Sequence, residues 1–210
     1  VANTVSGAIT DFSPYAGGSG TLIELSGFGT AALDGSMNAS EWPSTGCASF
    51  PADLPGGGTT PAKVCIMNDG SNLYVGGALS PPGVIRAILF IFFDNTDDGF
   101  NAGDDVLIAE CGPPLLNCAA SGGFADEFQT LCPGGVLCNE PDTDHGGSKD
   151  VLGKFDQASG VFAFEMSHPL QSGDPTHDFV VTGGITMGFS VTVLLESSSS
   201  SMFTFFPFPD

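Results

Sequence analysis

The chain has 210 residues, and its 24 acidic residues against 4 basic ones give a formal net charge of -20 at pH 7. A chain so poor in Lys and Arg cannot neutralise phosphates, which excludes nucleic acid as a partner and disfavours an anionic membrane surface. The acidity does not indicate disorder, because 41% of the residues are hydrophobic and 18 are Phe. The longest apolar run, residues 87–93, is too short to cross a bilayer, so we expect no membrane insertion.

The length suits one domain with flanking segments. We expect a β-sandwich over residues 21–196, with an insertion at 110–150. A strand-capable extension precedes it over residues 1–20, and a serine linker with an apolar strand follows over 197–210. The chain begins with Val, and we interpret it as a mature, secreted protein whose signal peptide has been removed.

Short apolar or aromatic runs bounded by Gly, Pro, Asn or Asp follow one another along the chain, as they do in all-β domains. We expect strands at 21–30, 62–67, 72–79, 86–93, 160–166, 178–182 and 186–195. Residues 68–70 and 157–160 have the composition of hairpin turns. No stretch of 12 residues carries the apolar repeat of a capped helix. The pattern predicts an all-β fold, an antiparallel β-sandwich of jelly-roll type.

Six cysteines without a Cys-x-x-Cys pair predict three disulfides, which are typical of proteins outside the cytoplasm. They are Cys47, Cys65, Cys111, Cys118, Cys132 and Cys138. Local spacing favours pairing 47 with 65, 111 with 118 and 132 with 138, while a nested pairing of 111 with 138 and 118 with 132 fits nearly as well. Four of the cysteines lie within residues 110–150, where few runs resemble strands, so we expect a long disulfide-stapled loop there. The sequon at Asn38 is a candidate glycosylation site in the same compartment.

Half of the acidic residues, 12 of 24, lie between positions 94 and 150. Residues 94–105 have the spacing of a twelve-residue calcium loop, with Gly99 at position 6. The candidate ligands are Asp94, Thr96, Asp98, Phe100 and Asp105 at positions 1, 3, 5, 7 and 12, with Asp97 and Asp104 as alternatives. The loop closes on Asp rather than Glu and lies between strands, so it is not an EF-hand. Five carboxylates this close would repel one another without a counter-ion, and we therefore expect bound Ca²⁺.

A second acidic segment, residues 139–150, has the right chemistry for another calcium ion without a recognisable spacing. Its candidate ligands are Asp142, Asp144 and Asp150. A third group, Asp174 with His177 and Asp178, could complete either site from across the fold.

Several short motifs together resemble one family. Leu33-Asp34-Gly35, then Glu41-Trp42, then Asn68-Asp-Gly-Ser-Asn-Leu-Tyr74 are similar to the opening of the family 9 carbohydrate-binding modules and their DOMON-like relatives. The segment 93–99 fits the family's calcium-loop position, and 162–170 resembles a late strand. The resemblance covers roughly residues 30 to 195. It implies a jelly-roll-like sandwich with bound calcium and, in many members, sugar recognition.

The chain departs from that family where ligands bind. Sugar-binding members often hold the ligand between two tryptophans, whereas this chain has one Trp, at a position typical of a structural role. Tyr15 and Tyr74 are the other amphipathic rings. Met166 and His168 are two apart on one expected strand, so they cannot ligate haem from opposite faces. No catalytic motif is present, and we expect no enzyme activity.

The two ends of the chain are apolar, which suggests assembly. We expect an extracellular structural subunit that binds copies of itself in filaments or a surface layer by donating a terminal strand to the next protomer. The candidate assembly residues are Val1, Val5, Ile9, Phe203, Phe205 and Phe206. A last strand that completes its own sheet is the alternative for the C-terminal end. Polysaccharide binding is the alternative function.

Overall fold

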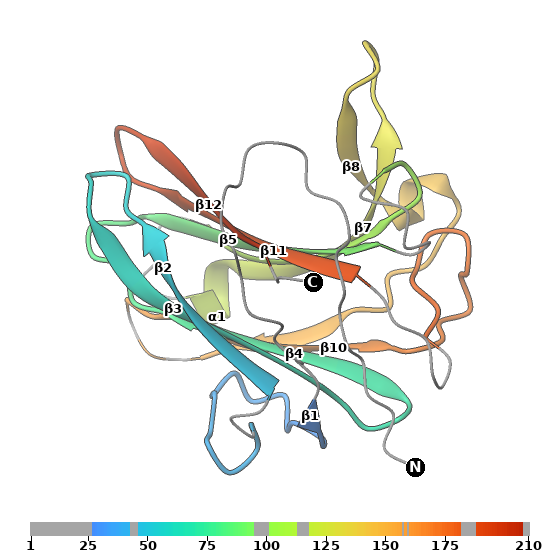
Figure 1. The fold of residues 1–210 in the computed structure, drawn as a ribbon, viewed down its shortest axis with the longest axis horizontal. Helices are drawn as coiled ribbons and strands as arrows, with labels where there is room; N and C mark the ends of the chain where they lie inside the picture. The colour runs from blue at the N-terminus through green and yellow to red at the C-terminus, as the bar shows by residue number, and fades with distance from the viewer. Residues whose placement is uncertain are drawn as a thin grey trace.

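The computed structural model describes residues 27–42, 46–94, 101–112, 118–156, 158, 160–181 and 188–207. These form two packed six-stranded sheets, a β-sandwich (Figure 1). Sheet A consists of β1 (Gly27–Phe28), β2 (Cys47–Asp53), β3 (Thr59–Asn68), β4 (Asn72–Leu79), β9 (Leu152–Phe155) and β10 (Phe162–Pro169). Sheet B consists of β5 (Arg86–Asp94), β6 (Asp105–Cys111), β7 (Gly122–Leu131), β8 (Leu137–Pro141), β11 (Gly188–Glu196) and β12 (Ser201–Pro207). Two short helices interrupt this order. α1 (Cys118–Ser121) lies between β6 and β7, and η2 (Asp142–His145) lies between β8 and β9.

The strand order is β1-β3-β4-β10-β9 in sheet A, with β2 also paired to β3, and β12-β11-β5-β6-β7-β8 in sheet B. All pairs are antiparallel except the short β1–β3 pair. The predicted all-β sandwich is thus confirmed. No helix among the described residues is long and apolar enough to cross a membrane.

Alternating side chains build the core between the sheets. On β5 the residues at 87, 89, 91 and 93 are buried in the main core, and on β10 those at 162, 164 and 166 meet them from the other sheet. Successive side chains of a strand point to opposite faces, so each strand needs only every second residue to be apolar for this core. The remaining positions on β5 lie on the outer face of sheet B.

One buried network joins three of the sequence motifs in sheet A. The Trp42 indole donates to Glu165 Oε1 at 2.7 Å, and the backbone N–H groups of Asp34 and Gly35 donate to Oε2 at 3.0 and 2.9 Å. Gly35 has φ +88°, and a Cβ there would lie 2.2 Å from the carbonyl carbon of Phe155. Only glycine fits this turn. These residues therefore hold the fold together, as expected for a structural Trp.

The expected strands at 62–67, 72–79, 86–93, 160–166 and 186–195 correspond to β3, β4, β5, β10 and β11, and the 68–70 turn joins β3 to β4. The expected strand at 178–182 is wrong over its described part, residues 178–181, where the structure has only an isolated bridge between Gln171 and Val180. Of the expected strand at 21–30, only the part after residue 26 lies within the described residues, where β1 spans two residues.

The expectation of a long loop at 110–150 is wrong in its secondary structure. The segment holds α1, the ten-residue β7, β8 and η2, and β7 and β8 extend sheet B beyond β6. Most β7 residues are only half-buried, so the strand carries Asp, Glu, Gln and Thr and lacks the apolar run of a central strand. The β7–β8 hairpin projects from the body of the sandwich (Figure 1).

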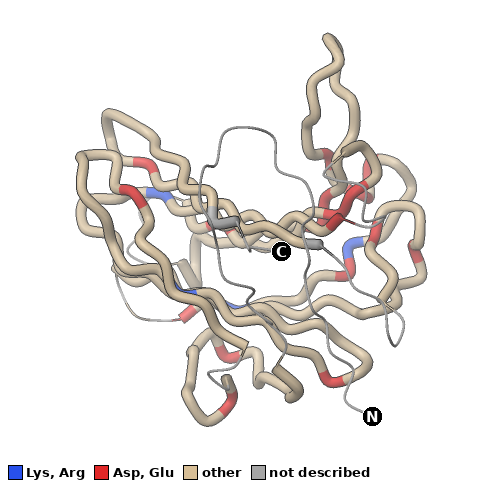
Figure 2. The backbone as a smooth tube through the Cα atoms, in the orientation of Figure 1, with Lys and Arg blue, Asp and Glu red and all other residues tan. Residues whose placement is uncertain are grey.

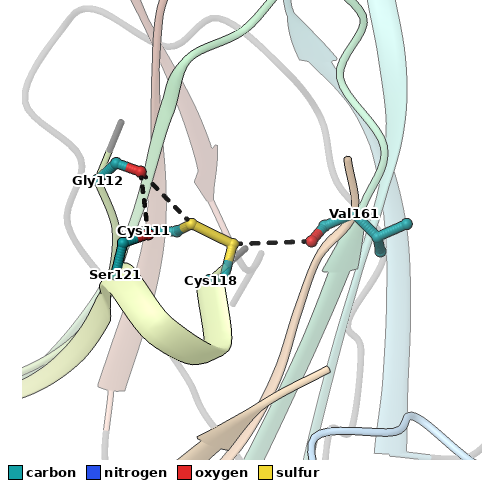
Figure 3. The surroundings of a disulfide bond; sticks show 5 residues. All are labelled: Cys111, Gly112, Cys118, Ser121 and Val161. Carbon is teal, nitrogen blue, oxygen red and sulfur yellow. Dashed lines mark hydrogen bonds between the residues drawn. A yellow bond between two sulfur atoms is a disulfide. The ribbon is translucent and has the colours of Figure 1, made fainter. Parts of the chain in front are cut away.

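The structure contains the three local disulfides, Cys47–Cys65, Cys111–Cys118 and Cys132–Cys138, and not the nested alternative. Figure 3 shows the second of these, where α1 turns the chain from β6 into β7. The carbonyl oxygens of Gly112 and Val161 lie 3.8 and 3.7 Å from its two sulfurs, and Ser121 Oγ donates to the Gly112 carbonyl at 3.5 Å. Because Val161 directly precedes β10, this disulfide lies where the end of sheet B contacts sheet A.

The C-terminal strand is not donated. β12 pairs antiparallel with β11 of its own chain, so the expected donation of the C-terminal segment is wrong and the alternative holds. The serine-rich turn between them is closed by Ser197 N–H donating to the Ser200 carbonyl at 2.8 Å. Val1, Val5 and Ile9 lie outside the described residues, as does the side chain of Phe206.

Candidate metal centre

The inner faces of three strands change from apolar residues to possible metal ligands at the same end of the sandwich. On β6 the inward positions 111, 109 and 107 lead to Asp105, and on β7 Asp126 lies opposite Leu107. On β10 the inward Phe162, Phe164 and Met166 lead to His168. Figure 2 shows acidic positions gathered at this end, beside the β7–β8 hairpin. The two sheets thus deliver polar side chains into one buried space.

Two ligand groups form there. The histidine site consists of Asp105, Asp126, His168 and Asp178, and the oxygen site consists of Asp142, Asp174 and Asp178. Within each group, one ligand atom from every residue lies within 4.8 Å of the others. Two ligands of one ion cannot be further apart than twice the metal–ligand distance, about 4.8 Å for calcium, so each group could surround a cation.

Backbone amides orient two of the carboxylates. Asp105 Oδ2 accepts the N–H of Phe179 at 3.2 Å. Asp126 Oδ2 accepts the N–H groups of Asp150 and Val151 at 2.6 and 3.0 Å. Each carboxylate therefore has one oxygen fixed by backbone N–H groups, an arrangement that orients metal ligands in proteins.

The atoms that face the centre have no partner. Buried oxygens without a hydrogen bond are Asp105 Oδ1, Asp126 Oδ1 and both oxygens of Asp142 and Asp178, and His168 Nε2 is in the same condition. All five residues are almost completely inaccessible to solvent. Burying unpaired carboxylates costs several kcal/mol each unless a cation or a proton compensates. Among the described residues, these buried oxygens and His168 Nε2 are therefore available to coordinate a cation.

The tautomer of His168 follows from its contacts. Nδ1 lies 2.8 Å from the carbonyl oxygen of Pro169, and because a carbonyl can only accept, Nδ1 carries the proton. Nε2 lies 3.6 Å from Asp126 Oδ2 and 3.8 Å from Asp178 Oδ2, beyond hydrogen-bond distance. With Nδ1 as the donor, Nε2 is the ring nitrogen that faces the centre and the one that could ligate a metal.

The oxygen site is closed by a tight loop. Asp174 accepts from Thr176 Oγ1 at 2.8 Å and from the backbone N–H of Ser148 at 3.2 Å, and its Oδ2 lies 2.8 Å from His177 Nδ1. A Cβ at Gly147 would lie 2.2 Å from Asp174 Oδ2 and 2.9 Å from the Cβ of Asp142. The absence of a side chain at Gly147 lets the two carboxylates approach.

The pKa shifts of the carboxylates in the centre reflect their burial next to one another. Burial raises the pKa of Asp105 well above its ordinary value, and repulsion from Asp126 adds to this. Burial, with the neighbouring Asp178 and Asp126, raises the pKa of Asp142 to about 8. Burial also raises the pKa of Asp126 and of Asp178. At Asp174 burial acts in the same direction, but hydrogen bonds from His177 and Thr176 outweigh it and lower the pKa. A bound cation would favour the ionised form of every carboxylate here.

The structure brings together some predicted ligands and separates others. Asp105 and Asp142 enter the centre, with Asp174 and Asp178 joining from across the fold. Asp144 is exposed, and Asp150 supplies a backbone N–H to Asp126 while its carboxylate accepts from Ser148, so neither belongs to a ligand group.

Within the described part of the 94–105 loop, Asp94 and Asp104 are buried but belong to neither ligand group. Asp104 Oδ2 accepts the N–H of Asn101 at 2.7 Å. Thr96, Asp97, Asp98 and Phe100 lie outside the described residues. The calcium loop over 94–105 stays a prediction.

Asp126 and His168 were missed as metal ligands by sequence reasoning. Asp126 lay in the presumed loop, and His168 was considered only for haem. The signal that could have found both is the two-residue alternation of the strands, which turns these polar residues inward.

A second feature is an apolar cluster on the opposite side of sheet B from the main core, where Ile88, Val106, Ile108 and Leu194 are buried while Phe203 and Phe205 on β12 are exposed. This outer patch consists of Ile88, Phe90, Phe92, Val106, Ile108, Ala125 and Leu194, continued on β12 by Phe203 and Phe205. The rings of Phe90 and Phe92 stack at 6.0 Å, and those of Phe203 and Phe205 at 6.3 Å. A groove of about 500 Å³ crosses the patch, and Arg86, Glu110 and Glu127 contribute polar groups to its lining.

Comparisons with solved structures found several similar chains, among them the following two. A family 9 carbohydrate-binding module of Caldicellulosiruptor kristjanssonii, solved with cellotriose, is 16% identical, with 86% of this chain and 80% of that chain covered and a TM-score of 0.47. A Bacteroides uniformis protein thought to bind carbohydrate is 12% identical, with 85% and 87% covered and a TM-score of 0.41. No protein-family model and no curated protein sequence matches the chain.

Proposed function

We propose that this protein is an extracellular, calcium-dependent structural β-sandwich that self-associates through the outer patch and the edge strand β12. The observation that carries the proposal is the exposure of Phe203 and Phe205, at 51% and 72%, on an edge strand. The three disulfides support the extracellular location. Large aromatic side chains exposed on an uncharged edge strand are candidates for a protein interface.

Charge supports the same surface. Two copies that each carry a formal charge of -20 repel one another over most of their surface. Residues 197–209, which include β12, hold no charged residue, and the outer patch itself consists of uncharged side chains. Edge strands that avoid pairing usually carry Lys or another charge, and β12 carries none. Copies can therefore approach most closely here.

Sedimentation velocity tests the self-association. The double variant Phe203→Ser/Phe205→Ser should stay monomeric at concentrations where the wild type associates, and added salt should strengthen wild-type association by screening the repulsion. Phe28→Ser is the matched control, because Phe28 is 62% exposed but lies on sheet A. A wild type that stays monomeric at high concentration with calcium and salt would refute the proposal.

The cation we propose for the centre is Ca²⁺. The centre is rich in carboxylate oxygens, which are the ligands that calcium prefers, and its unpartnered buried oxygens support the assignment. Since both sheets contribute ligands, the ion would join them at this end of the molecule. Its removal is expected to weaken the whole sandwich rather than a single loop.

Carbohydrate binding is the second candidate, favoured by the groove on the outer patch. Phe90 offers a ring face, and Glu110 with Glu127 offers acceptors for sugar hydroxyls. Against this, Trp42 and Tyr74 are 2% and 7% exposed and cannot form a platform. Affinity electrophoresis in soluble glucans should show retardation that Phe90→Ala abolishes. Equal mobility of wild type and Phe90→Ala in every glucan would exclude this candidate.

A further inference from the structure

We propose that the metal centre holds two unlike cations, a first-row transition-metal dication in the histidine site and Ca²⁺ in the oxygen site. This inference rests on the proposed calcium centre and divides it into two chemically distinct positions. The two positions share Asp178 and otherwise use different residues.

The geometry favours two ions over one. Asp142 and Asp174 meet the 4.8 Å limit with Asp178, in a group separate from the one that contains His168. Asp178 has two buried oxygens, and although Ser172 and Asp142 lie close to its carboxylate, neither oxygen makes a hydrogen bond of normal geometry. A carboxylate with both oxygens available can give one to each of two neighbouring cations. Asp178 is therefore the residue that would bridge the pair.

The ligand chemistry separates the two ions. The oxygen site offers only carboxylate oxygens, which suit Ca²⁺. The histidine site adds the Nε2 lone pair of His168, and its Nδ1–H donates to the Pro169 carbonyl, the usual support for a metal-bound imidazole. Imidazole with carboxylates suits zinc, iron, manganese or cobalt better than calcium.

A metal-free alternative is an imidazolium surrounded by carboxylates. In that case Nε2–H should donate to a carboxylate at about 2.8 Å. The observed separations from Asp126 and Asp178 are 3.6 and 3.8 Å, and the facing Asp105 Oδ1 has no partner. Such spacings fit ligands arranged around a common ion better than an ion pair.

Competition on the wild-type protein tests the inference without variants. Chelator-treated protein is titrated with Co²⁺, whose visible absorption reports nitrogen ligation, and Ca²⁺ binding is measured by calorimetry before and after Co²⁺ is bound. We expect one Co²⁺ per chain that Zn²⁺ displaces and Ca²⁺ does not, with Ca²⁺ still binding the cobalt-loaded protein. Mutual displacement of Co²⁺ and Ca²⁺ would overturn the two-site arrangement.

Variants assign the sites. His168→Gln should abolish the cobalt absorption and keep calcium binding, and Asp142→Asn should weaken calcium binding at least about tenfold and keep the cobalt absorption. His145→Gln is the control for adventitious binding, because His145 is exposed beside Glu140. A cobalt band lost in His145→Gln and kept in His168→Gln would overturn the assignment.

These experiments distinguish failure of the two-cation arrangement from failure of the calcium centre itself. Calcium binding without any cobalt absorption in the wild type overturns this inference and leaves the calcium centre standing. Binding of neither ion overturns both. If His168→Gln does not fold, the wild-type competition still decides the outcome.

Discussion

At the scale of single residues, buried carboxylates in this chain fall into two kinds. Glu165 has both oxygens occupied by hydrogen bonds from Trp42 and the turn at Asp34 and Gly35, so its burial is compensated within the protein. Asp142 is equally inaccessible, and the side chain that interacts with its carboxylate is another carboxylate, that of Asp178. The first kind stabilises the fold by itself, whereas the second needs a cation or a proton.

Gly147 gives a residue-scale prediction. Gly147→Ala would place a Cβ against Asp174 Oδ2 and Asp142, so the two carboxylates must separate. We expect calcium affinity, measured by calorimetry, to fall by about tenfold or more, equivalent to about 1.4 kcal/mol. Gly173→Ala is the control, since a Cβ there meets nothing within 4 Å. Equal affinities in the two variants would contradict the assigned oxygen site.

Sequence reasoning identified the ligands that lie in acidic runs and missed those that stand alone in strands. Asp142 was predicted from its cluster, and Asp178 was recognised as a residue that could complete a site from across the fold. Asp126 and His168 are single polar residues within strands, and only the sheet register shows that they face the same space. Local spacing in the sequence does not predict which distant strands pair or in which register.

At the scale of elements, long apolar strands were predicted best, including the edge strand β12, whereas the central β6 and the more polar β7 and β8 were missed. β5 and β11 are rich in apolar residues on both faces. One face belongs to the main core, and the other contributes to the outer patch. β7 and β8 lie at the edge of sheet B and carry many polar residues, so they resembled a loop. Partial burial, rather than chain flexibility, explains that composition.

The two short disulfides give an element-scale prediction. Cys111–Cys118 and Cys132–Cys138 close loops of similar length, with separations of 7 and 6, so the entropy that each removes from the unfolded chain is similar, about 2 to 3 kcal/mol. Cys111 and Cys118 are buried between the sheets, while the second pair is at the projecting hairpin.

Replacing both cysteines by Ala should therefore lower the melting temperature more at 111 and 118 than at 132 and 138. Calorimetry of the two double variants measures the difference. A larger loss at the hairpin would contradict the account of α1 as a tie between the sheets.

At the scale of the whole molecule, the buried carboxylates of the metal centre make the stability of the fold depend on pH. Without metal, the raised pKa of Asp142, about 8, means that the folded state holds a proton that the unfolded state releases near pH 4. Its contribution to stability is complete below the unfolded pKa and is lost as the pH rises through about 8. Asp105, Asp126 and Asp178 shift in the same direction.

The metal-free protein should therefore melt at a lower temperature at pH 8 than at pH 5. The gain on adding Ca²⁺ should grow over the same interval, because the ion binds the ionised carboxylates. Thermal melts in matched buffers measure both trends. A metal-free melting temperature that rises from pH 5 to pH 8 would contradict the assignment of these carboxylates as unpaired.

The central claim is that a cation at the buried carboxylates joins the two sheets, and a thermal melt with and without calcium tests it most directly. An ion present at about 1,000 times its dissociation constant stabilises the folded state by about 4 kcal/mol. For a chain of this size, that raises the melting temperature by about 10 °C. We predict a rise of this order with Ca²⁺ over chelator at pH 7.5. Identical melting temperatures in the two conditions would contradict the claim.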